Sequence, residues 1–338
     1  MIVHQVLSGA GPVDAVTVQA LRFRELFRGW GWGGDVFAGN LDPRVGRRVR
    51  PLGELAPEPD ATILVHYSAY APRLRGVLDL PQRKVLLSHN VTPPRWFWDH
   101  EPMVAIQCAL GRRQLPEFAA RCDVVAGVSA FNAAELGSDR VVPILVEPAS
   151  MGEPRTAEPG GPPTLLFVGR LAPHKRQDEL IRLVALLRRH RLPDARLRLV
   201  GSPLHPRFER ELRTLADALA PGAVTIESGL DPAALAARYR EAHALVCLSE
   251  HEGFCIPLLE AFHHGVPVVA RPVGGIPEVA GDAALLVEDR DLAVLAELVA
   301  MLLGDAPLRH ELRARGRARL AAYAPDAVAA QLRALLEP

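Results

Sequence analysis

The chain has 338 residues, enough for two domains that each bury a core of their own. Its 39 basic residues balance 39 acidic residues, so the composition argues against binding nucleic acid through a broad basic surface and against general attraction to anionic membranes. No apolar run approaches the roughly 18 residues needed to cross a bilayer, and the start at Met1 lacks the charge and apolar tract of a signal peptide. We therefore expect a soluble, cytoplasmic protein.

Short runs of branched and aliphatic residues alternate with helical patterns, which is typical of parallel strands joined by crossover helices. In the first half these runs are 2–9, 35–39, 61–68, 84–90, 123–129 and 140–148, and in the second half they are 164–170, 196–202, 224–229, 244–250, 266–272 and 283–289. Between the two series lies a Pro- and Gly-rich segment with the composition of a linker. The sequence therefore predicts two Rossmann-like doubly wound α/β domains facing a cleft, with an N-terminal domain 1–148, a linker 149–163 and a C-terminal domain 164–338 that ends in a helix.

The loop after the first predicted strand, SGAGPVDAV, contains Gly9 and Gly11. The third glycine of a dinucleotide fingerprint is absent and Asp14 stands in its place, so we do not expect a nicotinamide cofactor. The loop either makes a tight turn into a helix or brings the Gly11 backbone close to a ligand. The basic amphipathic segment 17–32 that follows predicts a crossover helix with its apolar face inward, and contact with a membrane is the alternative.

Three further side chains in the first half are candidates for contact with an acceptor. His66 and Tyr67 end the strand 61–68, and Trp96 lies in the loop after His89. Aromatic rings stack on sugars and on flat acceptors, but the same residues could instead pack in the core of the domain. His89 ends the strand 84–90, where it either faces the cleft or is satisfied inside the core.

In the second half a basic cluster follows the first strand. That strand ends at Gly169, and Arg170 and Lys175 come before a helix that begins near Gln177. Cationic groups at the carboxyl end of a strand are well placed to neutralise a diphosphate leaving group. The alternative is a solvated run of surface charge.

Two acids flank the start of a later helix. Pro257 suits the first position of that helix and Gly265 suits its end, so Glu252 lies in the preceding loop and Glu260 about one turn inside. The amides between Phe254 and Ile256 would supply donors for phosphate or sugar oxygens. Carboxylates beside such donors fit the hydroxyl groups and phosphates of a sugar nucleotide, although a loop acid and a solvated helix acid would give the same spacing.

The sequence predicts no metal ion and no cofactor. Four cysteines show no ligand spacing, which predicts buried and reduced thiols, and the pair His263 and His264 beside Cys255 lacks further ligands. The motif Asp289-x-Asp291 has the spacing of a manganese site but follows a late strand, where solvated turn acids are common.

Taken together, the GR pair followed by Lys175, the stretch EGFCIPLLEA and the stretch GVPVVARPVGGIPE resemble the retaining glycosyltransferases of family 4, which have the GT-B fold. The resemblance implies a nucleoside diphosphate sugar as donor, a hydroxyl as acceptor, retention at the anomeric carbon and no metal. It implies that Arg170 and Lys175 hold the diphosphate, that Glu252 contacts the donor sugar and that Glu260 contacts the ribose. The donor site would comprise Gly11, Gly169, Arg170, Lys175, Glu252, Gly253, Phe254, Cys255, Ile256 and Glu260. At Cys255 many members have glycine.

The first half resembles a branch of the same family through SHNVTPPRWF and SAFNAAEL. By that resemblance His89 reaches the donor sugar and joins Arg170, Lys175 and Glu252 as a catalytic residue. We expect UDP as the nucleotide, with GDP second, and the sequence identifies neither the acceptor nor the oligomeric state. A GT-B-like UDP-sugar epimerase and a non-catalytic nucleotide-sugar-binding subunit are the alternatives.

Overall fold

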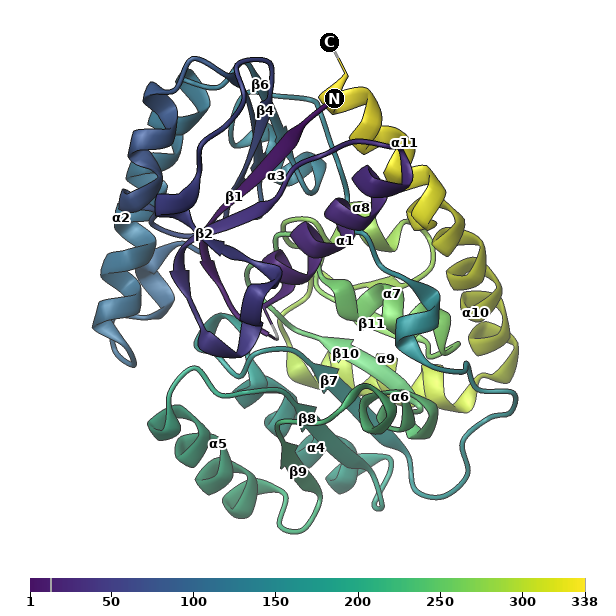
Figure 1. Cartoon of the computed structure of the whole chain (residues 1–338). Helices are drawn as coiled ribbons and strands as arrows, with labels where there is room; N and C mark the ends of the chain where they lie inside the picture. Colours follow the sequence, from purple (N-terminus) through teal and green to yellow (C-terminus); the bar gives the residue numbers. More distant parts are fainter. Residues whose placement is uncertain (13, 338) are drawn as a thin grey trace. The chain divides into compact units, whose positions relative to one another are not determined.

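The computed structural model describes residues 1–12 and 14–337, which form two compact units (Figure 1). Unit 1 comprises Met1–Trp98, Pro102–Leu145 and Pro325–Pro338, and unit 2 comprises Asp99–Glu101 and Val146–Ala324. Val13 and Pro338, which the predicted domains include, lie outside the described residues.

The first unit is built on a parallel sheet with the strand order β3-β2-β1-β4-β5-β6. Its strands are β1 (Val3–Ala10), β2 (Val36–Leu41), β3 (Arg50–Pro51), β4 (Thr62–Tyr67), β5 (Arg83–Ser88) and β6 (Val124–Gly127). Every residue of β4 is buried, as expected for a central strand covered on both faces. The order reverses at β1 and β4, which is the doubly wound arrangement.

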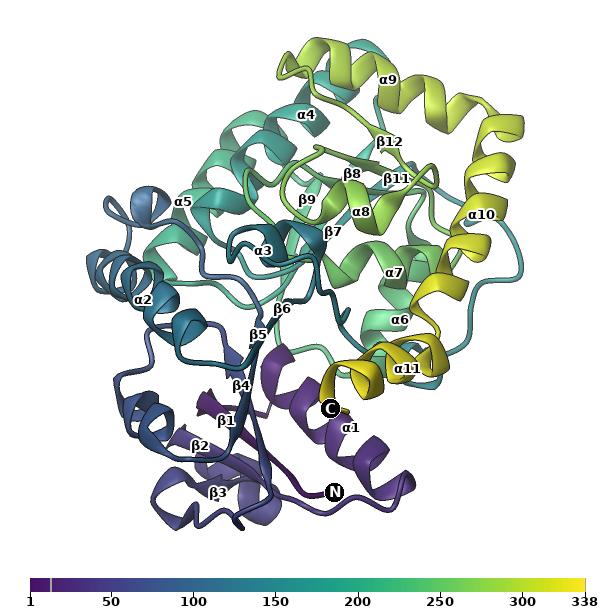
Figure 2. The same cartoon turned by 90° about the horizontal axis from the view of Figure 1, so that it is seen from above.

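Helices cover both faces of the first sheet. They are α1 (Ala15–Gly29), α2 (Pro102–Ala120), α3 (Ala130–Ala134) and α11 (Pro325–Leu336), with a 3-10 helix, η3 (Pro72–Asp79), between β4 and β5. Figure 2 shows α1 and α2 on opposite sides of this sheet. The segment predicted as a crossover helix is α1, and it buries Phe23 and Phe27 as its inward face.

The second unit repeats the same topology. Its parallel sheet has the order β12-β11-β10-β7-β8-β9. The strands are β7 (Thr164–Val168), β8 (Arg196–Val200), β9 (Val224–Glu227), β10 (Ala244–Cys247), β11 (Val268–Ala270) and β12 (Leu285–Leu286). The order reverses at the neighbours β7 and β10, so the loops after these two strands lie at the position where ligands of such sheets bind.

The helices of the second unit are α4 (Gln177–His190), α5 (Pro206–Leu219), α6 (Pro232–Glu241), α7 (Ile256–His263), α8 (Ile276–Ala280), α9 (Leu292–Gly304) and α10 (Ala306–Leu320). One hydrophobic core joins α4, α5 and α9 to the sheet, with Phe167, Leu183 and Val299 among its fully buried members. Helix α7 packs against α10 through a close approach of Gly316 to the ring of Phe262.

The structure corrects two predicted boundaries. The expected strand 140–148 is not a strand, and only Val141 makes an isolated bridge, to Gly127. Pro143 explains this difference, because proline cannot donate to a strand ladder. The segment 149–163, predicted as a linker, groups with unit 2, and Arg155 within it donates to the carbonyl of Ala242.

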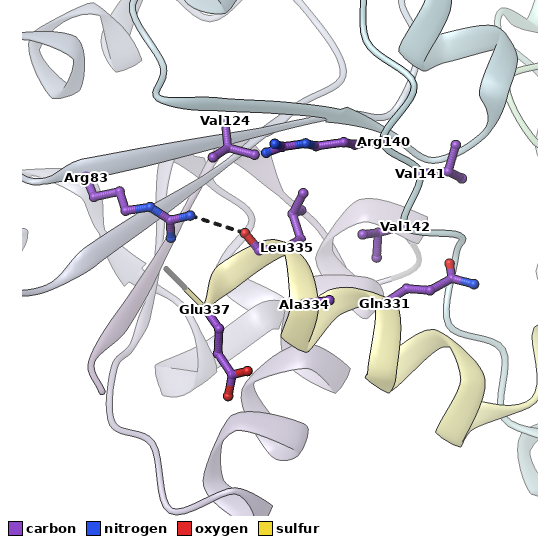
Figure 3. A pocket seen from close by; sticks show the side chains of 9 residues that line it. All are labelled: Arg83, Val124, Arg140, Val141, Val142, Gln331, Ala334, Leu335 and Glu337. Carbon is purple, nitrogen blue, oxygen red and sulfur yellow. Dashed lines mark hydrogen bonds between the residues drawn. The ribbon is translucent and has the colours of Figure 1, made fainter.

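The C-terminal helix also differs from the prediction, because α11 belongs to unit 1 rather than to the domain 164–338. Arg83, at the start of β5, donates to the carbonyls of Leu336 at 2.6 Å and Leu335 at 3.3 Å. Figure 3 shows the bond to Leu335 beside a hollow of about 620 Å³ between α11 and the starts of β5 and β6. Along α11, the guanidinium of Arg333 lies 5.7 Å from the ring centroid of Trp30.

Among the described helices, none combines the length and the apolar character that a membrane crossing requires.

Candidate active site

The predicted donor residues of the second unit follow two neighbouring strands. β7 leads through Gly169 and Arg170 into a 3-10 turn, η6 (Pro173–Lys175), and then into α4. β10 leads through Ser249 to Glu252 and then into α7. Because β7 pairs directly with β10, the carboxyl ends of both strands deliver their loops to the same place. Lys175 and Glu252 meet there, as the topology requires.

Lys175 and Glu252 form a close and shielded ion pair. The ammonium of Lys175 donates to Oε2 of Glu252 at 2.5 Å, and the two side chains are 17% and 9% exposed. The other carboxylate oxygen, Oε1, accepts from the hydroxyl of Ser249 at 2.7 Å. Burial opposes the charge of Lys175, but the carboxylate of Glu252 together with the neighbouring Cys255 and Cys247 outweighs this effect, so the pKa of Lys175 is raised. The pair therefore presents a fixed cation next to a fixed anion at the switch point of the sheet.

The loop that carries Glu252 has an unusual backbone. Cys255 is the N-cap of α7 and adopts φ 78° and ψ 66°, a left-handed conformation that favours glycine, and it makes no side-chain capping bond. The prediction placed Pro257 first in this helix, whereas Ile256 is first and Pro257 second. Gly265, the predicted end, has φ 64° and follows the C-cap residue of α7, His264.

Gly274 shapes the same loop from the other side. An added Cβ at Gly274 would lie 1.9 Å from the carbonyl oxygen of Glu252, and one at Gly275 would lie 2.4 Å from that of Gly253. The amide of Gly275 donates to the Glu252 carbonyl at 3.0 Å. The GG pair thus lets a second backbone segment pack against the loop and fix the position of Glu252.

Glu260 lies one turn inside α7, as predicted, and is held by a tyrosine. The hydroxyl of Tyr239, on α6, donates to Oε2 of Glu260 at 2.6 Å. Burial raises the pKa of Glu260, although the bond from Tyr239 partly offsets this effect. The ring of Tyr239 stacks on His264 with centroids 5.3 Å apart. Glu260 is therefore oriented by a buried partner and is not a solvated helix acid.

An ion-pair network ties together the loops that follow β7, β10 and β11. Arg176, whose φ is 55°, pairs with Glu179 at 2.5 Å and with Glu250 at 3.0 Å. Arg271 pairs with the same Glu179 and donates to the carbonyl of Leu248 at 2.8 Å. Arg170 is exposed, and its carbonyl accepts from Gln177 at 3.1 Å. The network links the loops to one another, and Arg170 remains exposed beside it in the sequence.

In the first unit, two predicted histidines contact each other. Nδ1 of His66 lies 2.9 Å from Nε2 of His89, and Nε2 of His66 lies 2.9 Å from the side-chain oxygen of Gln5. His66 is fully buried, whereas His89 is half-buried. His66 therefore positions His89 and is not itself exposed to an acceptor. Burial lowers the pKa of His89 to about 3, so its imidazole is neutral.

Tyr67 is a core residue, which corrects its prediction as an acceptor contact. It is fully buried, and its hydroxyl, with one proton to donate, lies 2.8 Å from the carbonyl oxygen of Gly111 and 3.0 Å from the side-chain oxygen of Gln114. Trp96 is half-buried and carries the guanidinium of Arg95 over its ring at 4.2 Å. Its role at an acceptor stays a prediction, as does the role of His89.

The glycine loop after β1 is organised by its own helix cap. Asp14 accepts from the amide and the hydroxyl of Thr17, at 2.8 and 2.7 Å, and caps α1. The amide of Gly11 donates to Thr17 at 3.1 Å. The tight turn into α1 accounts for this loop, and contact of Gly11 with a ligand stays a prediction.

Sequence reasoning missed three side chains and one glycine that shape the site: Tyr239, Ser249, Cys247 and Gly274. Ser249 stands three residues before Glu252, and Gly274 lies in the quoted stretch GVPVVARPVGGIPE, so both could have been found from the motifs. Tyr239 could not, because only the placement of α6 beside α7 brings it to Glu260. Cys247 and Cys255 are buried, as predicted for the cysteines, whereas Cys108 and Cys122 are only half-buried.

Residues 153–319, just under half of the chain, match a family described as glycosyl transferases group 1. The D-inositol 3-phosphate glycosyltransferase of Corynebacterium efficiens is 36% identical over 157 residues, which cover 42% of this chain and 35% of that protein. The GDP-mannose-dependent monoacylated alpha-(1-6)-phosphatidylinositol monomannoside mannosyltransferase of Corynebacterium glutamicum is 36% identical over 172 residues, 47% of this chain and 43% of that protein. The match therefore spans less than half the length of either relative.

Among solved structures, Anabaena Alr3699/HepE in complex with UDP and glucose superposes with a TM-score of 0.78, at 15% identity and covering 99% of each chain. At that identity the likeness concerns the fold. Together with the two doubly wound parallel sheets it confirms the predicted fold class, GT-B.

Proposed function

We propose that this chain, whose residues 153–319 match the glycosyl transferases group 1 family, transfers a glycosyl group from a nucleoside diphosphate sugar to an acceptor hydroxyl. The observation that carries the proposal is the contact between Lys175 and Glu252 at the point where the strand order of the second sheet reverses. Glu260, one turn inside α7, is held nearby in the chain by Tyr239. The second unit thus supplies a cation paired with one carboxylate and, within the following helix, a second carboxylate, which suits a ligand that carries hydroxyl groups at both ends and a diphosphate in the middle.

The proposed roles follow from the chemistry of each group. Lys175 has three N–H donors, so it can keep Glu252 as a partner while it donates to a phosphate oxygen. Arg170 is exposed nearby in sequence and would add a second cation to the diphosphate. The start of α7 lacks a side-chain cap, which suits its amides to phosphate or sugar oxygens. Glu252 would accept from the sugar hydroxyls, and Glu260 from the ribose.

We further propose that the transfer retains the anomeric configuration and needs no metal. In this mechanism the bond from the anomeric carbon to the diphosphate oxygen breaks, and Lys175 and Arg170 offset the charge that builds on that oxygen. The acceptor oxygen attacks from the same face and gives its proton to the leaving phosphate. Glu252, already bound to Lys175 and Ser249, acts as a binding group. An inverted product anomer, measured by NMR, would contradict this mechanism.

The donor nucleotide is a separate question. We favour UDP, in line with the sequence prediction and with the UDP bound by the similar HepE structure. GDP is second, and it gains weight from the relative that is named as GDP-mannose-dependent. Nothing in the contacts around Glu260 selects one base over the other, so both nucleotides belong in the first experiment.

The deciding experiment is thermal stabilisation of the full chain by UDP, GDP and ADP. A ligand at about a hundred times its dissociation constant adds roughly 2.7 kcal/mol to the stability of a protein. We expect one nucleotide to raise the Tm of the wild type and the Glu260→Ala variant to lose this shift. The control is Glu288→Ala, which removes an exposed acid of the same unit and should keep the shift. No shift with any nucleotide would overturn the proposal. Turnover of the donor sugar without an acceptor would point to an epimerase instead.

A further inference from the structure

Three potential metal ligands lie close together at the Lys175–Glu252 pair, and Glu252 itself is one of them. They are the thiols of Cys247 and Cys255 and the carboxylate of Glu252, whose donor atoms all lie within 4.8 Å of one another. Cys247 ends β10, whereas Cys255 is the left-handed N-cap of α7, so different backbone elements fix the two thiols. The three residues are between 4% and 8% exposed. The sequence spacing gave no sign of this cluster.

Two of the three distances between ligand atoms are close to those of tetrahedral coordination, and the third, from Sγ of Cys255 to the carboxylate of Glu252, lies within 4.8 Å. Zn–S bonds of about 2.3 Å at the tetrahedral angle place two sulfur ligands about 3.8 Å apart, and a sulfur and an oxygen ligand about 3.6 Å apart. In the structure Sγ of Cys247 lies 4.0 Å from Sγ of Cys255 and 3.8 Å from Oε1 of Glu252. The sulfur separation is about twice the 2.05 Å of a disulfide bond, so the geometry suits two ligands of one ion better than a disulfide.

The charges of the cluster also balance. With both thiols protonated, the carboxylate of Glu252 and the ammonium of Lys175 cancel. If Zn²⁺ binds and the two thiols release their protons to solvent, the two thiolates cancel the ion and the Lys175–Glu252 pair remains neutral. A buried site is stable only when its charges are compensated, and this cluster meets that condition both with and without the metal.

We propose that Cys247, Cys255 and Glu252 form a binding site for Zn²⁺, with Oε1 of Glu252 and the two thiolates as protein ligands and a water in the fourth position. Two soft thiolates favour zinc over magnesium, calcium or manganese, which prefer oxygen ligands. The ion would replace the hydroxyl of Ser249 as the partner of Oε1. Lys175 would keep Oε2, because it approaches the carboxylate through the other oxygen.

Zinc at this site would act as an inhibitor of donor binding. This consequence rests on the proposed function, in which Glu252 accepts hydrogen bonds from the donor sugar. A carboxylate that is bound to zinc through one oxygen and to Lys175 through the other has less capacity left for sugar hydroxyls. The metal would therefore weaken binding of the nucleotide sugar by about tenfold, the value of one hydrogen bond to a charged group. Binding of the free nucleotide, which has no donor sugar, would be weakened less.

The binding test uses Co²⁺ as a spectroscopic probe for zinc. The full chain, freed of metal with a chelator and kept reduced with a phosphine, is titrated with Co²⁺. We expect a thiolate-to-cobalt charge-transfer band that saturates at one equivalent and that Zn²⁺ abolishes. The band should be lost in Cys247→Ser and in Cys255→Gly, a substitution that the left-handed φ of this position accommodates. The double variant Cys108→Ser, Cys122→Ser should keep it. Absence of the band in the wild type, or its persistence without Cys247 and Cys255, would overturn the site.

The inhibition test measures the affinity for the nucleotide sugar with and without zinc, from the same thermal shifts. Zinc should raise the apparent Kd of the wild type about tenfold and leave that of Cys247→Ser unchanged relative to its own zinc-free value. An equal Kd in the wild type with and without zinc would overturn the antagonism. A failure of every nucleotide sugar to stabilise the metal-free protein would overturn the proposed function, and the cobalt titration would still decide the metal site.

Discussion

Lys175 donates to Glu252 across 2.5 Å although the two residues are 77 positions apart in the chain. Each follows one of the two strands at which the order of the second sheet reverses, so the doubly wound topology alone brings them together. Both side chains are largely shielded from water, at 17% and 9% exposure. Removing either partner would therefore leave the other charge shielded and uncompensated.

We predict that the losses of stability from replacing Lys175 and Glu252 are not additive. Lys175→Met leaves the carboxylate of Glu252 shielded and without its cation, which should lower the free energy of unfolding by about 3 kcal/mol. The double variant Lys175→Met, Glu252→Gln should lose less than the sum of the two single variants. Urea unfolding of all four proteins gives the coupling energy. Additive losses would show that the two charges do not stabilise each other.

A second prediction concerns the left-handed N-cap of α7. An L-residue with φ 78° is strained, and glycine is not, so Cys255→Gly should be more stable than Cys255→Ala by about 1 kcal/mol. Both variants remove the thiol, so their difference isolates the backbone. Equal stability of the two in urea, or greater stability of the alanine variant, would contradict the strain.

Much of this fold could be predicted from the sequence, because alternating buried strands and amphipathic helices allow few arrangements. The doubly wound pattern also predicts that Lys175 and Glu252 lie in the loops after the strands 164–170 and 244–250. The partner of α11 was not predictable, because an amphipathic helix shows which of its faces is apolar and not which surface it covers. The contact between Tyr239 and Glu260 was missed for a similar reason. The contact depends on how α6 packs against α7, which cannot be predicted from the sequence of either helix.

A third prediction tests the close approach of the GG pair to the donor loop. Gly274→Ala combines φ 57° with a Cβ 1.9 Å from the carbonyl oxygen of Glu252, so the loop must move. We expect a loss of at least about 2 kcal/mol in stability and a weaker Tm shift with the preferred nucleotide sugar. Gly304→Ala is the control, because Gly304 ends α9 with open space around it. A Gly274→Ala protein as stable as the control would refute the close packing.

The anchoring of α11 gives a fourth prediction. Arg83 donates to the carbonyls of Leu335 and Leu336 at the end of this helix, so Arg83→Ala should lower stability by about 1.5 kcal/mol and speed hydrogen exchange of the α11 amides. Arg140→Ala removes a guanidinium that lines the same hollow and should leave this exchange unchanged (Figure 3). Equal exchange of α11 in both variants would show that Arg83 does not hold the helix.

The contact between His66 and His89 gives a fifth prediction, about pH. One ring nitrogen must accept the hydrogen bond at 2.9 Å, so the two rings cannot both be protonated without losing it. Burial lowers the pKa of His89 to about 3 from an ordinary value of 6.5. Between these two values the unfolded chain binds more protons than the folded one, so stability falls as the pH falls from about 6.5 towards 3.

Removing His89 should reduce this dependence. Between pH 7 and pH 5, His89→Gln should lose less stability than the wild type, because one group with a lowered pKa is gone. The two pH values are about half a unit above and well below the ordinary histidine pKa. His310→Gln, which replaces an exposed histidine, should follow the wild type. Urea unfolding at several pH values measures all three slopes. If the His89→Gln and wild-type curves run parallel, His89 is not held neutral by burial, and its contact with His66 does not set its protonation state.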